Sequence, residues 1–137
     1  VQTCALPIYH EWSSQYMAAN AAGWDWCGLN LDDGSALMAF RMRGKEGGVA
    51  YAPAGVAFEP QRQWKSPRTG TSYPVSMLVT SGDRKILLEP LMDDQELDAR
   101  ASTGTIYWEG AVRASENGRP AGRGYLELTG YWKPMRL

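Results

Sequence analysis

One short segment constrains the fold more than any other: residues 23–43 read as two strand-like runs around an acidic turn. The runs are GWDWCGLNL and SALMAFRMR, and the letters DDG lie between them. Asp33-Gly34 tolerates the positive backbone angles that tight hairpin turns require. The segment therefore predicts an antiparallel hairpin whose first strand carries Asp25 between Trp24 and Trp26.

The length of this turn decides what Asp25 faces across the hairpin. If Asp33-Gly34 forms a two-residue turn, Asp25 faces Met42 and lies on an otherwise apolar surface. If residues 32–34 form a three-residue loop with Gly34 in a bulge, Asp25 instead faces Arg41. The first register predicts a desolvated carboxyl group suited to general-acid chemistry, and the second predicts a structural ion pair. The sequence leaves both registers open.

Further short strands are expected along the rest of the chain. We predict strands at residues 49–52, 55–59, 73–80, 85–91, 105–114 and 123–132, with hairpin loops at 81–84 and 115–122 and an acidic connection at 93–97. Turn signals recur roughly every 8–12 residues, as in β-sandwiches and barrels, and no useful helical period is present. We therefore expect one all-β domain, folded as an antiparallel up-and-down β-barrel because closure removes exposed strand edges.

The composition excludes several classes of function. The net charge is −1 and the basic residues are dispersed, so the chain lacks the basic patch of a nucleic-acid-binding protein. Six Trp and seven Tyr against two Phe is an unusual balance. Such rings combine an apolar body with a polar group and suit ligand pockets and interfaces as well as cores. No apolar run approaches the length needed to cross a membrane.

The first eight residues differ in character from the rest. Val1 to Ile8 (VQTCALPI) lacks the basic leader and apolar stretch of a signal peptide, and it resembles the translation of a sequencing-adapter oligonucleotide. We expect residues 1–8 to be a non-native or disordered leader and residues 9–137 to form the domain. Cys27 is then the only cysteine, which excludes a disulfide framework and a cysteine-rich zinc site.

Few side chains in the sequence are candidates for catalysis or for binding a metal or ligand. His10 is the sole histidine, and no G-x-S-x-G nucleophile motif or metal-ligand spacing accompanies it, so we expect neither a metal nor a cofactor. Asp25 is the most informative acid: it is either a desolvated proton donor or a paired structural group. Tyr107 and Glu109 share one face of a predicted strand, and Glu109 can lie near Glu127 if the last two strands pair. The alternative for these glutamates is a solvated polar face.

A set of short segments extends over essentially everything after Ile8. They are HEWSSQ at residues 10–15, GWDWCGLNLDDG at 23–34, Leu37-Met38 with Arg41, W-x-SP-x-x-G at 64–70 with Tyr73-Pro74, DQEL at 94–97, YWEGAV at 107–112 and GYLELTGY at 124–131. In this order the segments resemble those of the lipocalin-like family of bacterial AttH-type secreted proteins and carotenoid hydratases (hydroxyneurosporene synthases).

This resemblance implies a lipocalin-like (calycin) fold of two consecutive barrels, of which this chain is similar to the second, with the N-terminal barrel missing. It implies an exported protein, periplasmic or secreted, and partners among ABC-transporter components. In the hydratase branch, water adds across a carbon–carbon double bond of an isoprenoid. The pair His10 and Trp12 resembles that branch's catalytic His-x-Trp motif. The label "predicted hydrolase" that some members carry is unsupported by the motifs here.

Together these observations give two expectations for function. The first is a domain that binds an apolar small molecule, a lipid or isoprenoid, and contributes to a hydratase-type (hydro-lyase) reaction on it. The second is an accessory domain that recognises a partner. The candidate catalytic residues are His10, Trp12 and Asp25, and the candidate ligand-binding residues are Trp24, Trp26, Arg41, Tyr107 and Glu109. In a hydration, a desolvated acid protonates the alkene and aromatic faces stabilise the carbocation.

Overall fold

The computed structural model describes residues 20–135 of the chain. Within that range every regular element is a strand. A search of the same residues for a helix long and apolar enough to span a membrane finds none. In chain order the strands are β1 (Ala21–Leu31), β2 (Ala36–Gly44), β3 (Val49–Tyr51), β4 (Val56–Lys65), β5 (Ser72–Ser81), β6 (Arg84–Pro90), β7 (Glu96–Ala99), β8 (Thr105–Glu116) and β9 (Arg119–Thr129).

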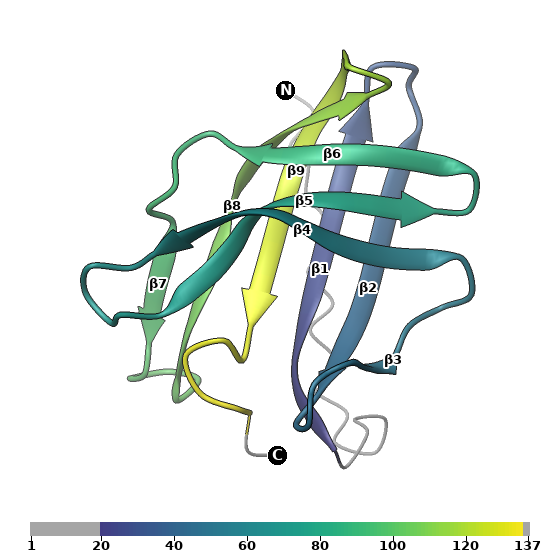
Figure 1. The fold of residues 1–137 in the computed structure, drawn as a ribbon. Coiled ribbons are helices and arrows are strands. Elements are labelled where there is room, and N and C mark those ends of the chain that lie inside the picture. The colour runs from purple at the N-terminus through teal and green to yellow at the C-terminus, as the bar shows by residue number, and fades with distance from the viewer. Residues whose placement is uncertain (1–19, 136–137) are drawn as a thin grey trace.

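These strands form one antiparallel sheet that curls on itself. Hydrogen-bonded neighbours follow the order β3-β2-β1-β9-β8-β6-β5-β4, and β7 pairs with β8. The sheet bends so far that β4, β5 and β6 pass in front of β1, β2 and β9 in Figure 1. Its end strands, β3 and β4, are consecutive in the chain, and no ladder joins β2 to β4 among the described residues. The predicted all-β, barrel-like class is confirmed, with a curled sheet as its observed form.

The β1–β2 hairpin adopts the second of the two registers. The Leu31 N–H donates to the Ser35 carbonyl over 2.9 Å, which leaves residues 32–34 as a three-residue loop. Gly34 has a φ of 84°, a left-handed conformation that suits glycine. Asp25 is therefore the cross-strand partner of Arg41, and not of Met42. The turn at one end of the hairpin thus sets the surroundings of an acid seven residues away from it.

The concave face of the sheet carries the hydrophobic core. Its members are apolar residues spaced two apart on β1, β5, β6, β8 and β9, as alternation along a strand requires. The core residues are Cys27, Leu29, Leu31, Ala39, Phe58, Tyr73, Val75, Met77, Val79, Ile86, Leu88, Trp108, Val112, Ala114, Leu126 and Leu128. Burial raises the pKa of the Cys27 thiol to about 12, so this cysteine packs as a small neutral group.

Several predicted boundaries are wrong, each for a physical reason. The strand predicted at 55–59 extends to Lys65, because β4 lies at the end of the sheet, where Pro60 is tolerated. The predicted loop 115–122 shrinks to Asn117-Gly118, whose φ angles of 51° and 74° form a tight hairpin turn. Likewise only Gly82-Asp83 separates β5 from β6. The connection predicted at 93–97 enters a strand, β7, at Glu96.

A side chain takes the place of a backbone partner beside β8. The Gln95 amide accepts a hydrogen bond from the Ala111 N–H over 2.9 Å and donates one to the Ala111 carbonyl over 3.3 Å. The amide lies directly over Gly110, where a Cβ atom would overlap it. A side chain at position 110 would therefore displace the Gln95 amide, which anchors the acidic connection to the sheet.

We predict that Gly110→Ala lowers the free energy of unfolding by about 1–3 kcal/mol, because it displaces Gln95 and leaves the Ala111 N–H without its partner. Urea denaturation measures this loss. In a Gln95→Ala background the same Gly110→Ala change should cost much less, since its steric partner is gone. Equal costs in the two backgrounds would show that Gln95 does not explain the glycine.

Candidate functional site

Strand alternation places Asp25 on the concave face and its two tryptophan neighbours on the other face. Asp25 is fully buried, and it shares its face with the core residues Cys27 and Leu29. Trp24 and Trp26 point to the convex side, where their cross-strand partners on β9 are Thr129 and Glu127. The structure therefore separates the acid from both tryptophans that flank it in the sequence.

Two guanidinium groups and one phenol surround the Asp25 carboxylate. The Arg41 Nε–H donates to Oδ2 over 2.7 Å, and the Arg43 Nε–H donates to Oδ1 over 3.2 Å. The Tyr131 hydroxyl also donates to Oδ1, over 3.0 Å. Burying a carboxylate is costly unless charges and hydrogen bonds compensate it, and here both kinds of partner are present. The ion pair that the second register implies is confirmed.

The same arginines tie the cluster to backbone groups of other strands. Arg41 Nη1 donates to the Phe58 carbonyl over 2.6 Å, and its guanidinium lies 5.4 Å from the centre of the Phe58 ring. Arg43 Nη2 donates to the Thr129 carbonyl at the end of β9. Arg41 thus bridges β2 and β4 where no strand ladder connects them.

A series of aromatic rings leads from β4 to this cluster. The Trp64 and Tyr73 rings stack at 6.3 Å and 22°. The Tyr73 ring then contacts the Tyr131 ring at 5.9 Å, and the Arg43 guanidinium lies 3.7 Å from the centre of the Tyr131 ring. Trp64 and Tyr131 are partly exposed beside the core, whereas Tyr73 is fully buried. We call Asp25, Arg41, Arg43, Trp64, Tyr73 and Tyr131 the inner-face cluster.

Some of these residues could be anticipated from the sequence and others could not. Arg43 is two residues after Arg41, so strand alternation alone places both on one face. Trp64 lies beyond the strand predicted at 55–59, in the part of β4 that follows Pro60, where the sequence indicates a strand end. Alternation along the strand predicted at 123–132 places Tyr131 on the same face as Glu127 and Thr129, which is wrong. β9 ends at Thr129, and Gly130, with a φ of 81°, redirects the chain so that Tyr131 faces Asp25.

The convex face gathers four of the five predicted ligand-binding residues. Trp24, Trp26, Tyr107 and Glu109 project from it on β1 and β8, whereas Arg41 faces Asp25 on the concave side. Glu109 and Glu127 are cross-strand partners, as expected if β8 and β9 pair. Glu127 is 5% exposed and accepts hydrogen bonds from Trp24 Nε1 over 2.9 Å and Thr129 Oγ1 over 3.0 Å. The solvated polar face offered as the alternative does not hold for Glu127.

The charges on this convex face affect the pKa of the Tyr107 phenol. Burial raises the pKa of Tyr107 above its usual range, and the negative charges of Glu109 and Glu127 raise it further. Tyr107 therefore stays neutral beside these carboxylates. His10 and Trp12, the other predicted catalytic residues, lie outside the described residues, as does the leader at 1–8.

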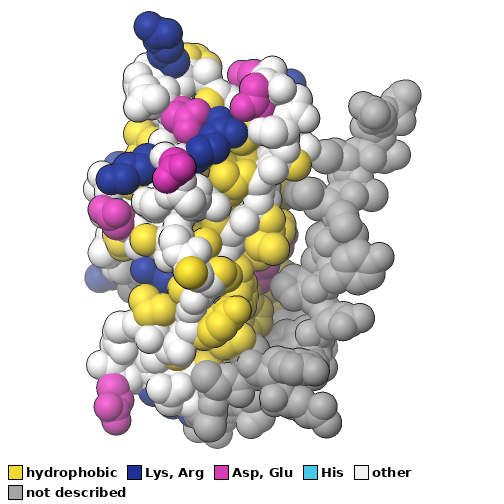
Figure 2. Space-filling view, turned by 90° about the vertical axis from the view of Figure 1, so that its right-hand side faces the viewer, with side chains coloured by type: hydrophobic (Ala, Val, Ile, Leu, Met, Phe, Trp, Pro, Cys, Tyr) yellow, Lys and Arg dark blue, Asp and Glu magenta, His cyan; other side chains and the backbone are white. Residues whose placement is uncertain are grey.

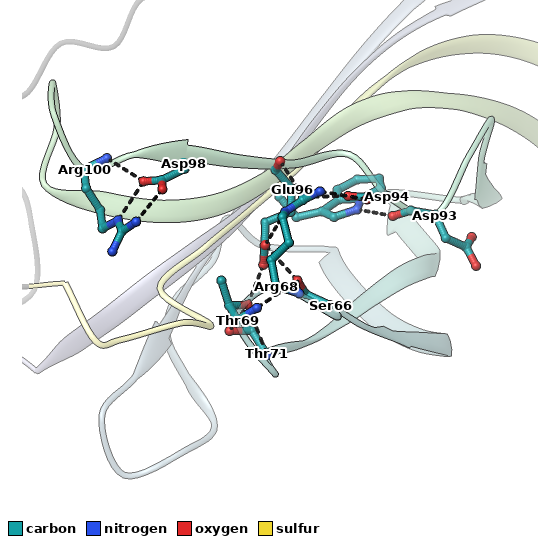
Figure 3. Close-up of polar contacts among 10 residues, drawn as sticks. Ser66, Arg68, Thr69, Thr71, Asp93, Asp94, Glu96, Asp98 and Arg100 are labelled. Atoms are coloured by element: carbon teal, nitrogen blue, oxygen red, sulfur yellow. Dashed lines mark hydrogen bonds and ion pairs between the residues drawn. The ribbon is translucent and has the colours of Figure 1, made fainter.

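A second polar cluster joins the β4–β5 loop to the start of β7. The Glu96 carboxylate accepts hydrogen bonds from Ser66 Oγ and Thr69 Oγ1, each over 2.8 Å, and these side chains point toward one another in Figure 3. Arg68 makes a two-bond contact with Asp94, and Arg62 makes one with Asp93. The acidic connection is thus bound to the β4–β5 loop through Arg68 and to β4 through Arg62.

A surface pocket of about 380 Å³ opens beside this second cluster. Its lining is mostly charged, with acids and bases balanced: Arg68, Thr69, Glu96, Asp98, Arg100, Ile106 and Trp132. Its arginines already pair with carboxylates, Arg68 with Asp94 and Arg100 with Asp98. Within residues 20–135, no three or more His, Cys, Asp or Glu side chains are placed to hold a metal ion. The inner-face cluster remains the stronger candidate site, because it joins buried charge to exposed aromatic surface.

We predict that Asp25→Ala lowers the free energy of unfolding by about 3–5 kcal/mol, because two part-buried guanidinium groups lose their only described carboxylate partner. Asp98→Ala is the matched control. It removes an exposed carboxylate from a similar arginine pair, and the loss should be far smaller. Urea denaturation compares the two, and comparable losses would mean that the Asp25 pairs contribute no more than a surface ion pair.

The buried phenol predicts a loss of stability at alkaline pH. Burial, and next the charge of Asp25, raise the pKa of Tyr131 well above its usual value of 10.0. Above that pH the unfolded chain loses the phenolic proton while the folded chain keeps it, so the free energy of unfolding falls as pH rises. The fall should be shallower in Tyr131→Phe, measured as the change in unfolding free energy between about pH 8 and pH 11. Identical slopes would contradict this origin.

Comparisons with known proteins identify a family and a related crystal structure. A family model described as AttH-like matches residues 8–131. No curated protein matches the chain. A crystal structure of a putative AttH from Nitrosomonas europaea is 52% identical, with a TM-score of 0.81. The match covers 88% of this chain and 42% of that one.

A second crystal structure shares the fold at lower identity. Kievitone hydratase from Nectria haematococca is 20% identical, with a TM-score of 0.52 over 85% of this chain and 42% of its own. At that identity the likeness shows the fold alone. Both structures are of longer chains, and this chain spans less than half of each, consistent with one of two domains. The family model covers nearly the whole sequence, and the chain belongs to the AttH-like family.

Proposed function

We propose that this domain binds an apolar small molecule, a lipid or isoprenoid, against the aromatic rings of the inner-face cluster. The observation that carries the proposal is the continuous series Trp64, Tyr73 and Tyr131, which runs from the surface toward the apolar core. Ligand sites in proteins are lined mainly by apolar and aromatic side chains, with a few fixed polar groups that orient the ligand. The inner-face cluster offers both on the concave side of the sheet.

The charged part of the cluster gives the site its fixed polar end. Asp25, Arg41 and Arg43 are held by hydrogen bonds to one another and to backbone carbonyls, so their positions are set before any ligand arrives. A preorganised site loses less conformational entropy on binding. The partly exposed rings of Trp64 and Tyr131 supply the apolar contact surface.

The proposal extends to a hydratase-type reaction on the bound molecule. Its support is the resemblance of His10 and Trp12 to a catalytic motif, together with a fold shared with kievitone hydratase. In this structure both Asp25 oxygens accept hydrogen bonds, from Arg41, Arg43 and Tyr131. If Asp25→Asn hydrates an isoprenoid alkene as fast as the unmodified chain, Asp25 has no part in the reaction.

A second candidate function is an accessory domain that contacts a partner, such as a component of an ABC transporter, in an exported protein. An exposed apolar surface on β2 and β3 favours it: Met38, Val49 and Tyr51 are each more than half exposed. Figure 2 views the side on which β2 and β3 lie in Figure 1, and hydrophobic side chains gather there. In a longer protein such a surface can also contact another domain.

Fluorescence titration with geranylgeraniol, a neutral isoprenoid alcohol, tests the binding proposal and locates the site. We expect Trp64→Leu to weaken binding about tenfold, since it removes a partly exposed ring of the inner-face cluster. Trp26→Leu is the matched control, because Trp26 lies on the convex face.

The two variants separate the possible outcomes. Weakening by Trp26→Leu alone would move the site to the convex face, where the sequence placed Trp24 and Trp26. Absence of binding by the unmodified chain, together with no lipid in solvent extracts of the purified protein, would overturn the proposal and favour the accessory role.

A further inference from the structure

Charge is unbalanced within the inner-face cluster. Arg41 and Arg43 both pair with Asp25, and no second carboxylate among the described residues pairs with either of them. Their side chains are only 14% and 18% exposed. Buried charges are normally neutralised by partners, so an excess positive charge in this position is unusual. It creates a local preference for an anion.

The unused donors of these arginines show where an anion would bind. Arg41 uses Nε for Asp25 and Nη1 for the Phe58 carbonyl, which leaves Nη2 without a bond among the described residues. Arg43 uses Nε for Asp25 and Nη2 for the Thr129 carbonyl, which leaves Nη1. A guanidinium group carries five N–H donors, so each arginine keeps donors after its present bonds are made.

The neighbours of these donors are aromatic. Arg43 lies over the Tyr131 ring, and Tyr131 contacts Tyr73. An anion held by the arginines would therefore adjoin the ring surface to which an apolar chain is expected to bind. A site with a cationic end and an apolar wall suits a molecule with an anionic end and an apolar chain.

We propose that Arg41 and Arg43 bind the carboxylate head of a long-chain amphiphile, such as an isoprenoid or fatty acid, whose chain lies along the partly exposed rings of Tyr131 and Trp64. This inference rests on the proposed binding function and specifies the ligand class. Asp25 fixes the two guanidinium groups in place, and the ligand carboxylate supplies the second negative charge. The cluster then holds two cations and two anions.

A matched pair of ligands tests the inference: geranylgeranoic acid and geranylgeraniol, which differ only in the head group. We expect the unmodified chain to bind the acid about tenfold more tightly than the alcohol, because hydrogen bonds between charged groups add affinity. In Arg43→Met, which keeps one arginine for Asp25 and much of the aliphatic stem, the ratio of the two affinities should fall toward one. Arg43→Lys should restore part of it.

The outcomes distinguish failure of the proposed binding function from failure of the carboxylate site. If neither ligand binds, the binding function itself fails. If the alcohol binds as tightly as the acid to the unmodified chain, the function stands and the carboxylate site is overturned. A preference for the acid that persists in Arg43→Met also overturns it, since the charge acting on the head group then lies elsewhere. The last titrations use acetate and inorganic phosphate. If either small anion binds as tightly as geranylgeranoic acid, the site binds small anions and the amphiphile proposal is overturned.

Discussion

The burial of Asp25 against two arginines is the interaction on which the rest of the structure depends. A carboxylate in the concave face of a curled sheet would be prohibitively costly alone, and Arg41, Arg43 and Tyr131 compensate it from β2 and from the segment after β9. Arg41 also donates to the Phe58 carbonyl of β4. One acid thereby fixes the relative positions of β1, β2, β4 and the segment after β9, and it orients the ring of Tyr131.

This arrangement explains how the sheet can curl without a closing ladder. The two ends of the hydrogen-bonded path lie at β3 and β4, and edge strands leave backbone groups unpaired. At Phe58 the backbone group is satisfied by a guanidinium from β2, and the same guanidinium lies over the Phe58 ring. A side chain thus does locally what a neighbouring strand would do in a closed barrel. The seam between β2 and β4 is consequently both polar and close to the aromatic series.

The sequence predicted the fold class better than it predicted the site. Alternating apolar residues and glycine-containing turns were enough for an all-β, barrel-like fold and for the β1–β2 hairpin. The environment of Asp25 was left between two registers, because a one-residue difference in turn length exchanges Arg41 for Met42 and no local pattern decides between them. Tyr131 could not be anticipated: its direction follows from the positive φ of Gly130, a tertiary consequence of where β9 ends.

The chain belongs to the AttH-like family and matches less than half of a longer relative. We infer that Asp25 holds both Arg41 and Arg43 rigidly on the concave face of the described sheet. Nitrogen-15 NMR of the arginine side chains measures this directly through the exchange of the Nε–H protons with water. We expect slow exchange for Arg41 and Arg43, and loss of that protection for both in Asp25→Asn. Exchange as fast as that of an exposed arginine such as Arg119 would contradict the account.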